Sequence, residues 1–314
     1  MNRSKILTEG ALFTAIYAVL FVISMMVPVV GSIAIFLLPI PFVVYASRYS
    51  WKPALVMLAA SLILSAILAT IMSVPLTIFM ALGGIMIGAA MYNNVSAYET
   101  WARGTVGFVI GMVFLFILTQ FVFNVNIVEE INQMLNQSMD QAQGIMKQFG
   151  FADQAEEQLA MMEQQIDIMK NLLPAGIAII GIIYAFISQW LSYKVINRVW
   201  SKDYRFPPFR NLTLPVSLVW IYFFALIFTF FDLDSSGTLF LAVNNVLILV
   251  GTLMILQGYS LIFLYSHHKK WSKAIPVISI IAALLIPIVV VLVRILGIID
   301  IGFKLRDRIT AEKK

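Results

Sequence analysis

Repeated apolar segments of about twenty residues are the feature that most constrains this chain. A helix crosses the hydrocarbon core of a bilayer with about 20 apolar residues. Nine segments have this character or approach it: 10–30, 31–46, 53–72, 75–91, 104–124, 173–193, 214–231, 239–265 and 274–293. Only 12% of the 314 residues are charged, whereas soluble domains carry about 25%. The sequence predicts an all-α, polytopic transmembrane helical bundle of nine spans, with eight as the alternative count. Because the second segment is short and carries Pro39 and Pro41, we expect it to be kinked or tilted.

Basic residues predict the orientation of these spans. If the N-terminus is cytoplasmic, most of them fall on the cytoplasmic side, as the positive-inside rule requires. They are Arg3, Lys5, Arg48, Lys52, Arg103, Lys194, Arg198, Lys202, Arg205, Arg210, Lys269, Lys270 and Lys273. We therefore expect a multi-pass protein of the bacterial cytoplasmic membrane with its N-terminus inside. The tail 301–314 disagrees, because nine spans place its five basic residues outside. The side of the C-terminus stays open, and a re-entrant or miscounted segment would explain the conflict.

An acidic insertion, residues 125–172, separates the fifth and sixth segments. It holds eight acidic residues and two lysines, a charge of −6. Its apolar residues step by three and four, the heptad spacing with which two helices bury a shared stripe. Gly150 is suited to end one helix, and Asp153 with Glu156 to begin the next. The pattern predicts an extracytoplasmic, coiled-coil-like helical hairpin; helices lying flat on the membrane and disorder are the alternatives. The heptad positions are Val128, Ile131, Leu135, Ser138, Ala142, Ile145 and Phe149, then Ala155, Leu159, Met162, Ile166, Met169 and Leu173.

The predicted organisation therefore has four parts. Residues 1–124 hold the first five spans, and 125–172 form the hairpin. Residues 173–300 hold the remaining spans, and 301–314 form a basic tail. Self-association through 125–172 is one way in which the hairpin would act.

The chain has no recognisable catalytic constellation. It contains no cysteine and only two histidines, adjacent in a basic loop, and the common nucleophile, phosphate-binding and zinc motifs do not occur in it. The net charge of +5 resides in connections between apolar segments, which is the positive-inside pattern and not a nucleic-acid footprint. We expect no enzyme activity, no cofactor, no metal site and no nucleic-acid partner. The lipid bilayer is the expected surrounding.

Polar side chains inside the predicted spans are the candidate ligand-binding residues. In lipid such side chains face the bundle, where they bridge helices or line a cavity. The candidates are Gln120, Asn124, Gln189, Asn244, Asn245 and Gln257. Hydrogen bonding between helices is the alternative role for each of them.

Small residues predict close contacts between helices. The G-x-x-x-G pairs are Gly84 with Gly88 and Gly107 with Gly111, and a strip on the first segment consists of Ala11, Ala15 and Ala18. Internal packing is the simplest role for all of them. Docking of a partner subunit is the alternative for the strip.

Several of these stretches resemble known families. "EGALFTAIYAVL", the short Pro-containing second segment, "ASRYSWKPALVMLAASLILSAIL" and "MALGGIMIGAAM" resemble, over residues 1–125, the S components of energy-coupling-factor vitamin transporters. That resemblance implies six spans, an outward-facing vitamin site, and contact of Ala11 and Ala15 with a membrane coupling subunit. The extra spans and the acidic hairpin depart from that pattern. Over its whole length, including "YKVINRVW" and "GIIDIGFKLRDR", the chain resembles the YybS-like family of bacterial membrane proteins, a domain of unknown function.

Two functions follow from the sequence as hypotheses. One is S-component-like binding or transport of a small solute, with an outward cavity lined by the polar candidates. The other is a non-transporting membrane scaffold or regulatory protein, which acts through the hairpin and the basic loop 194–210.

Overall fold

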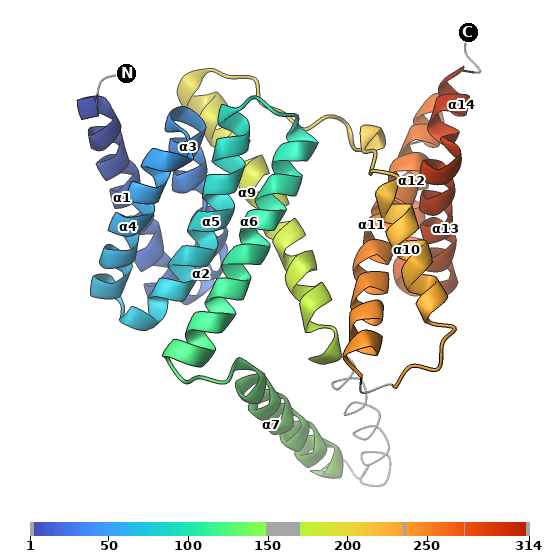
Figure 1. Ribbon diagram of the computed structural model, residues 1–314, viewed down its shortest axis with the longest axis horizontal. Helices are drawn as coiled ribbons and strands as arrows, with labels where there is room; N and C mark the ends of the chain where they lie inside the picture. Colours follow the sequence, from blue (N-terminus) through green and yellow to red (C-terminus); the bar gives the residue numbers. More distant parts are fainter. Residues whose placement is uncertain (1–2, 149–169, 235–236, 273, 312–314) are drawn as a thin grey trace. The chain divides into compact units, whose positions relative to one another are not determined.

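The described part of the chain is entirely helical. The computed structural model describes residues 3–148, 170–234, 237–272 and 274–311, and these form helices joined by short connections, without a β-strand (Figure 1). The chain divides into two compact units. Unit 1 comprises Met1–Lys170 and Ile177–Arg205, and unit 2 comprises Asn171–Gly176 and Phe206–Lys314. The predicted all-α fold is confirmed for these residues, and the predicted boundaries at 124, 172 and 300 stay a prediction.

Seven helical segments among the described residues are long and apolar enough to cross a membrane. They are α1 (Arg3–Met26), Pro28–Tyr49, α4 (Trp51–Leu68), Ile71–Tyr92, Ala97–Val122, α9 (Leu173–Trp200) and α11 (Thr238–His268). Two further apolar helices, α10 (Ser217–Phe228) and α12 (Ala274–Leu285), are shorter. A multi-pass helical protein is therefore confirmed, whereas the count of eight or nine spans stays a prediction.

The second predicted segment is broken, as its prolines predict. It consists of α2 (Pro28–Ala34), a 3₁₀ turn η1 (Ile35–Leu37) and α3 (Ile40–Tyr49). Pro39 and Pro41 lie at the junction, where their missing N–H groups are tolerated because a helix begins there.

Small residues hold the core of unit 1 together. Helix α5 (Val74–Tyr92) packs against α3 on one side and α6 (Ala97–Ile117) on the other. A Cβ atom added to Gly88 would lie 2.5 Å from the carbonyl oxygen of Val43, and one added to Gly107 would lie 2.8 Å from that of Leu82. Both G-x-x-x-G pairs therefore serve internal packing. The α1 helix joins this core through Tyr17, whose hydroxyl lies 2.8 Å from that of Thr77.

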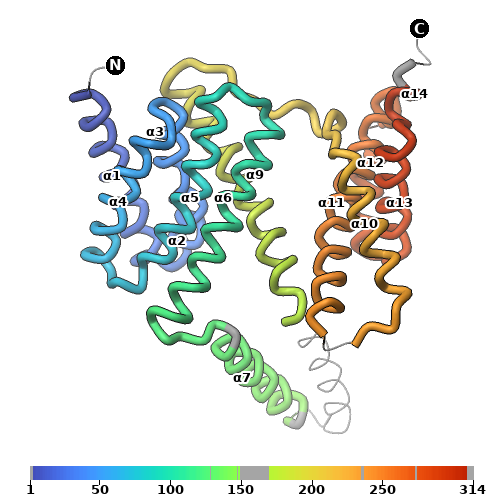
Figure 2. Tube along the Cα trace, viewed as in Figure 1, coloured from blue at the N-terminus to red at the C-terminus, as the bar shows by residue number. Residues whose placement is uncertain are grey.

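In unit 2, α11 is the helix against which α10, α12 and α13 (Pro287–Phe303) pack (Figure 2). Two glycines bring α11 and α13 into backbone contact. A Cβ added to Gly258 would collide with the carbonyl oxygen of Val293, and one added to Gly297 with that of Met254. Close backbone approach of this kind is typical of helices that associate in membranes.

The sequence predicts a single span over 274–293, and this is wrong. Helix α12 ends at Leu285 and α13 begins at Pro287, with an extended Ile286 (φ −125°, ψ 102°) between them. Proline supplies no N–H and disfavours helical geometry in the preceding residue, so an apolar run that looks continuous is interrupted there. With 12 residues at about 1.5 Å each, α12 is about 18 Å long and falls short of the roughly 30 Å core of a bilayer.

The chain folds back at this break. Gly251 lies beside Arg294 and Gln257 beside Asp300, so α13 runs parallel to α11. Helix α12 leads from the end of α11 to the start of α13 and therefore runs in the opposite direction (Figure 1). As a result, the terminal helix α14 (Leu305–Ala311) lies at the same end of unit 2 as the loop that follows α11.

The first arm of the predicted hairpin is helical, as α7 (Ile127–Gln148). Its exposed apolar side chains include Met134 and Ile145, at 66% and 57% exposure. The predicted turn at Gly150, the cap at Asp153 and the second heptad run lie outside the described residues. The hairpin and self-association through 125–172 stay predictions.

The fold-back predicts the sidedness of the C-terminal region. A cysteine placed at Ser272, after α11, and one placed at Arg308, in α14, should react with a membrane-impermeant maleimide from the same side. Asp232 precedes α11, so a cysteine there should react from the opposite side. The native chain has no cysteine, so each variant carries one reporter without background. Labelling of the positions 272 and 308 from opposite sides would contradict the fold-back.

Candidate functional site

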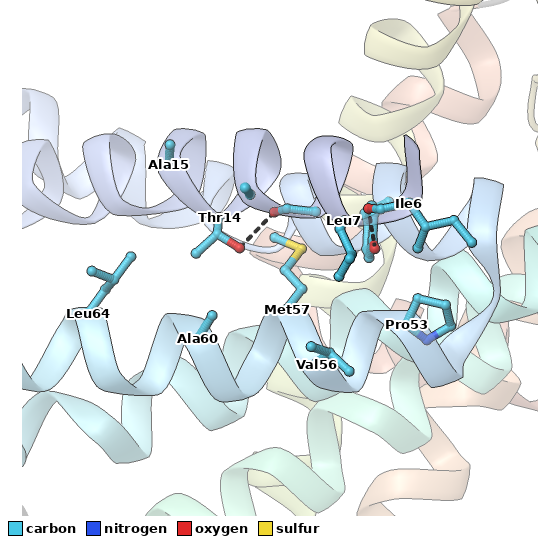
Figure 3. A pocket seen from close by; sticks show the side chains of 12 residues that line it. Ile6, Leu7, Thr14, Ala15, Pro53, Val56, Met57, Ala60 and Leu64 are labelled. Carbon is cyan, nitrogen blue, oxygen red and sulfur yellow. Dashed lines mark hydrogen bonds between the residues drawn. The ribbon is translucent and has the colours of Figure 1, made fainter. Parts of the chain in front are cut away.

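An apolar groove between α1 and α4 is the first candidate site (Figure 3). Its volume is about 400 Å³. One wall comes from α1, the other from α4, and Tyr45 of α3 lies at one end. The residues that line it are Ile6, Leu7, Gly10, Ala11, Thr14, Ala15, Tyr45, Pro53, Val56, Met57, Ala60 and Leu64.

The few polar groups of the groove are bonded within the protein. The Thr14 hydroxyl donates to the carbonyl oxygen of Gly10 at 2.8 Å, and the Tyr45 hydroxyl donates to that of Ile6 at 3.0 Å. Ala11 and Ala15 line the groove and are exposed, whereas Ala18 is half-buried and does not line it. The groove therefore offers an apolar surface with small side chains among its α1 residues, which suits hydrocarbon or a helix at close range.

Three of the predicted ligand-binding residues belong to unit 1. The amide nitrogen of Gln189 donates to the carbonyl oxygen of Ala97 at 2.9 Å and to the Tyr193 hydroxyl at 2.6 Å. Gln120 lies in a π-helical turn (Leu118–Val122) after α6, and Asn124 follows in the left-handed conformation (φ 53°). About 23 residues of helix separate the Ala97 and Gln120 ends of this segment, roughly 35 Å at 1.5 Å per residue. Gln189 and Gln120 therefore do not share a site.

The other three lie on α11 in unit 2. Asn245 accepts from the N–H of Ala175 at 2.8 Å and donates to the carbonyl oxygen of Asn171 at 2.7 Å, while Asn244 donates to Phe240 of its own helix. Gln257 accepts from the N–H of Leu214 at 3.0 Å. The Asn245 amide thus bonds the start of α9, and the Gln257 amide bonds the segment before α10. Hydrogen bonding between helices is the alternative role that the sequence left open.

Comparison with known proteins identifies the family. The chain matches the family model described as "Predicted membrane protein (DUF2232)" over residues 15–301. The chain belongs to the DUF2232 family. A relative from Bacillus subtilis (strain 168), "Uncharacterized protein YybS", is 30% identical over 309 residues, which cover 98% of this chain and 100% of that protein. No solved structure was found to match. The likeness to YybS-like proteins is confirmed, and the likeness to S components stays a prediction.

A buried ion pair in this DUF2232 chain is the most polar feature of unit 2. The Asp300 carboxylate is fully buried and accepts from the Arg306 guanidinium at 2.6 Å, and Gln257 donates to the same carboxylate at 2.5 Å. Arg306 reaches further, to the Thr213 hydroxyl at 2.8 Å. The cluster joins α11, the end of α13, the start of α14 and the segment before α10. It therefore ties the helix that precedes the fold-back, α11, to the helices that end it, α13 and α14.

Sequence reasoning missed this pair. In the sequence, Asp300 ends the predicted region of spans 173–300, and Arg306 lies in the basic tail 301–314. The two are six positions apart, and no helical spacing predicts their contact. Lys304, in the left-handed conformation (φ 50°), ends α13 and turns the chain so that Arg306 points back at Asp300. An acidic residue at the end of an apolar helix, followed within two turns by an arginine, is the signal available in the sequence.

Removing one partner of this pair should destabilise the protein strongly. The Asp300→Asn substitution keeps the shape but leaves the buried guanidinium unpaired, and breaking a buried pair in this way costs about 3–5 kcal/mol. The readout is the thermal unfolding of the purified protein in detergent. The additional Arg306→Gln substitution should restore part of the loss, because it removes the unpaired charge.

The matched control is the exposed pair Glu99–Arg103, with N–O distance 2.6 Å and side chains 48% and 45% exposed. Glu99→Gln should cost no more than about 0.5 kcal/mol. Equal effects of Asp300→Asn and Glu99→Gln would show that the buried cluster contributes nothing special to stability.

Proposed function

We propose that this DUF2232 protein is a non-enzymatic docking protein of the membrane, whose groove between α1 and α4 receives one transmembrane helix of a partner membrane protein. The observation that carries the proposal is the exposed pair Ala11 and Ala15 among the residues that line an apolar groove. In lipid, two helices gain little from hydrophobicity alone, because lipid tails are equally apolar. Close approach over small side chains is what drives them together.

A helix suits the groove better than a lipid chain does. Ala11 and Ala15 are four residues apart, so they lie one turn apart on the same face of α1. Larger apolar residues of α1 and α4 also line the groove, among them Leu7 and Val56, which are 67% and 64% exposed. A lipid chain adapts to any apolar surface and needs no small residues on it. A helix backbone needs small residues to approach closely.

Solute binding, the first hypothesis from the sequence, has less support. The side-chain amides of Asn245 and Gln257 are hydrogen-bonded through both the oxygen and the nitrogen. The Gln189 amide nitrogen donates to the carbonyl oxygen of Ala97 and to the Tyr193 hydroxyl. A solute would have to displace these hydrogen bonds. Each buried polar group left without a partner costs roughly 1–3 kcal/mol. The scaffold hypothesis requires no such displacement.

The proposed setting is the bacterial cytoplasmic membrane, with the N-terminus inside. The relative from Bacillus subtilis supports the bacterial setting. The fold-back of α12 and α13 supports the orientation within unit 2. It brings Arg308 of the tail to the end at which Lys269 follows α11. The basic tail thus no longer conflicts with the positive-inside rule.

The test is a site-specific photo-crosslink in native membranes. A photoreactive residue at Ala60, in the groove, should crosslink to a partner integral membrane protein. The same residue at Ala59, exposed on α4 but outside the groove, is the matched control and should not. Enlarging the two alanines by Ala11→Leu and Ala15→Leu should reduce the Ala60 crosslink about tenfold or more, because the partner helix can no longer approach closely.

Both alanines are exposed, so this double variant should keep its yield and its elution volume in size-exclusion chromatography. If position 60 forms adducts with lipid alone, or if positions 59 and 60 capture the same protein equally, the docking function is wrong.

A further inference from the structure

A second cavity, in unit 2, has a different chemistry from the groove. It is a cleft of about 650 Å³ that opens where residues 208–210 meet the end of α11 and the beginning of α12. The lining residues on which the argument rests are Phe209, Arg210, Phe263, His267, Lys270 and Trp271. Cationic and aromatic side chains thus share one concave surface.

The basic side chains of the cleft have no acidic partner among the described residues. The ion pairs found among the described residues include Glu9–Arg48, Glu99–Arg103, Asp203–Arg205 and Asp300–Arg306. Arg210 and Lys270 take part in none of them. Two cations that line one cleft repel each other, and an anion between them would remove that repulsion. The charge of the cleft therefore points to an anionic ligand.

The loop that carries Arg210 is fixed in place. The buried hydroxyl of Ser260 on α11 lies 3.0 Å from the carbonyl oxygens of both Phe209 and Leu212. The Phe209 ring packs edge-on against Phe263 of the same helix, with ring centroids 5.6 Å apart. Backbone groups on both sides of Arg210 are thus bonded to α11. The loop therefore holds the backbone of Arg210 at the mouth of the cleft.

The place of the cleft, at the end of α11, suits the headgroup layer of a membrane. Helix α11 has 31 residues, about 46 Å at 1.5 Å per residue, and exceeds the roughly 30 Å hydrocarbon core. A helix of this length extends beyond the core at one end or at both. Trp271, at its end, is 49% exposed, as expected of tryptophan at a membrane interface.

We propose that this cleft binds the phosphate headgroup of an anionic phospholipid. Arg210 and Lys270 contact the phosphate oxygens, and the aromatic walls accept the glycerol and the first carbons of the acyl chains. Basic pockets between helices at a membrane surface are known to suit such headgroups. A soluble phosphate shares the charge but gains nothing from the aromatic walls. The site is separate from the groove of unit 1, and the proposal does not depend on partner docking.

The experiment measures lipid binding to the purified full chain by native mass spectrometry in detergent. The probe is phosphatidylglycerol, and phosphatidylcholine serves as the zwitterionic comparison. In the test variant Arg210 becomes Gln and Lys270 becomes Asn, because position 270 has φ 56° and Asn tolerates that conformation. Phosphatidylglycerol should bind the test variant roughly thirtyfold more weakly, from about 1 kcal/mol for each cation removed.

The control variant removes two charges at the same end of unit 2 but outside the cleft, by Lys269→Gln and Arg308→Gln. It should bind phosphatidylglycerol as the native chain does. Lys270→Asn alone, should the double variant not fold, is expected to weaken binding about fivefold.

Three outcomes would overturn the proposal. In the first, the control loses as much affinity as the test variant, which would indicate diffuse surface charge. In the second, phosphatidylcholine binds the native chain as tightly as phosphatidylglycerol. In the third, an excess of inorganic phosphate displaces the lipid completely, which would assign the cleft to a soluble phosphate.

Discussion

A bilayer core supplies no hydrogen-bond partners for the backbone, and this constraint governs the whole chain. Where a helix is interrupted, the freed groups find partners nearby. At the α12–α13 break, the N–H of Ile286 still donates to the carbonyl oxygen of Ala282 at 2.8 Å, and Pro287 has no N–H to satisfy. The N–H of Val289 in turn donates to the carbonyl oxygen of Ile286 at 3.0 Å, so backbone bonds continue on both sides of the break.

The same constraint explains what the amides do. Asn245 bonds the backbone of 171–175, Gln257 bonds Leu214, and Asn197 bonds both the N–H and the carbonyl oxygen of Tyr204 at 2.8 Å. Each amide lies on a helix and binds backbone groups outside the turns next to it: Asn245 binds the N–H of Ala175 in the first turn of α9, and Gln257 and Asn197 bind connecting segments at Leu214 and Tyr204. An amide carries one acceptor and two donors at fixed geometry, which suits it to this role better than a hydroxyl. In this chain an amide side chain on an apolar helix therefore bonds the backbone of another segment, which leaves it less suited to bind a ligand.

The sequence predicts helix positions well and fails at contacts between distant segments. Hydropathy predicts α1, α4 and α11, and the glycine pairs predict the packing of α5 and α6, because both signals are local. The fold-back cannot be predicted from 274–293, since a proline in an apolar run is compatible with a kink or with a reversal. The Asp300–Arg306 pair depends on one left-handed residue, Lys304. Spacing singles out the strip that contains Ala11 and Ala15. Only the structure shows that these two residues line a groove whose second wall is α4.

Basic residues in the connections of a membrane protein are usually interpreted as topology signals only. In this structure they differ in whether an acidic residue compensates their charge. In unit 1, Arg48 pairs with Glu9 at 3.0 Å and stacks on Trp200, and in unit 2 Arg306 is neutralised by Asp300. These charges are compensated by the fold. Arg210 is held at a cleft by a loop fixed to α11 and has no acidic partner among the described residues. The positive-inside rule gives a reason for a basic residue in this loop. It gives none for an uncompensated cation on a loop bonded to α11 beside aromatic walls, and that difference distinguishes a topology signal from the binding site that we propose.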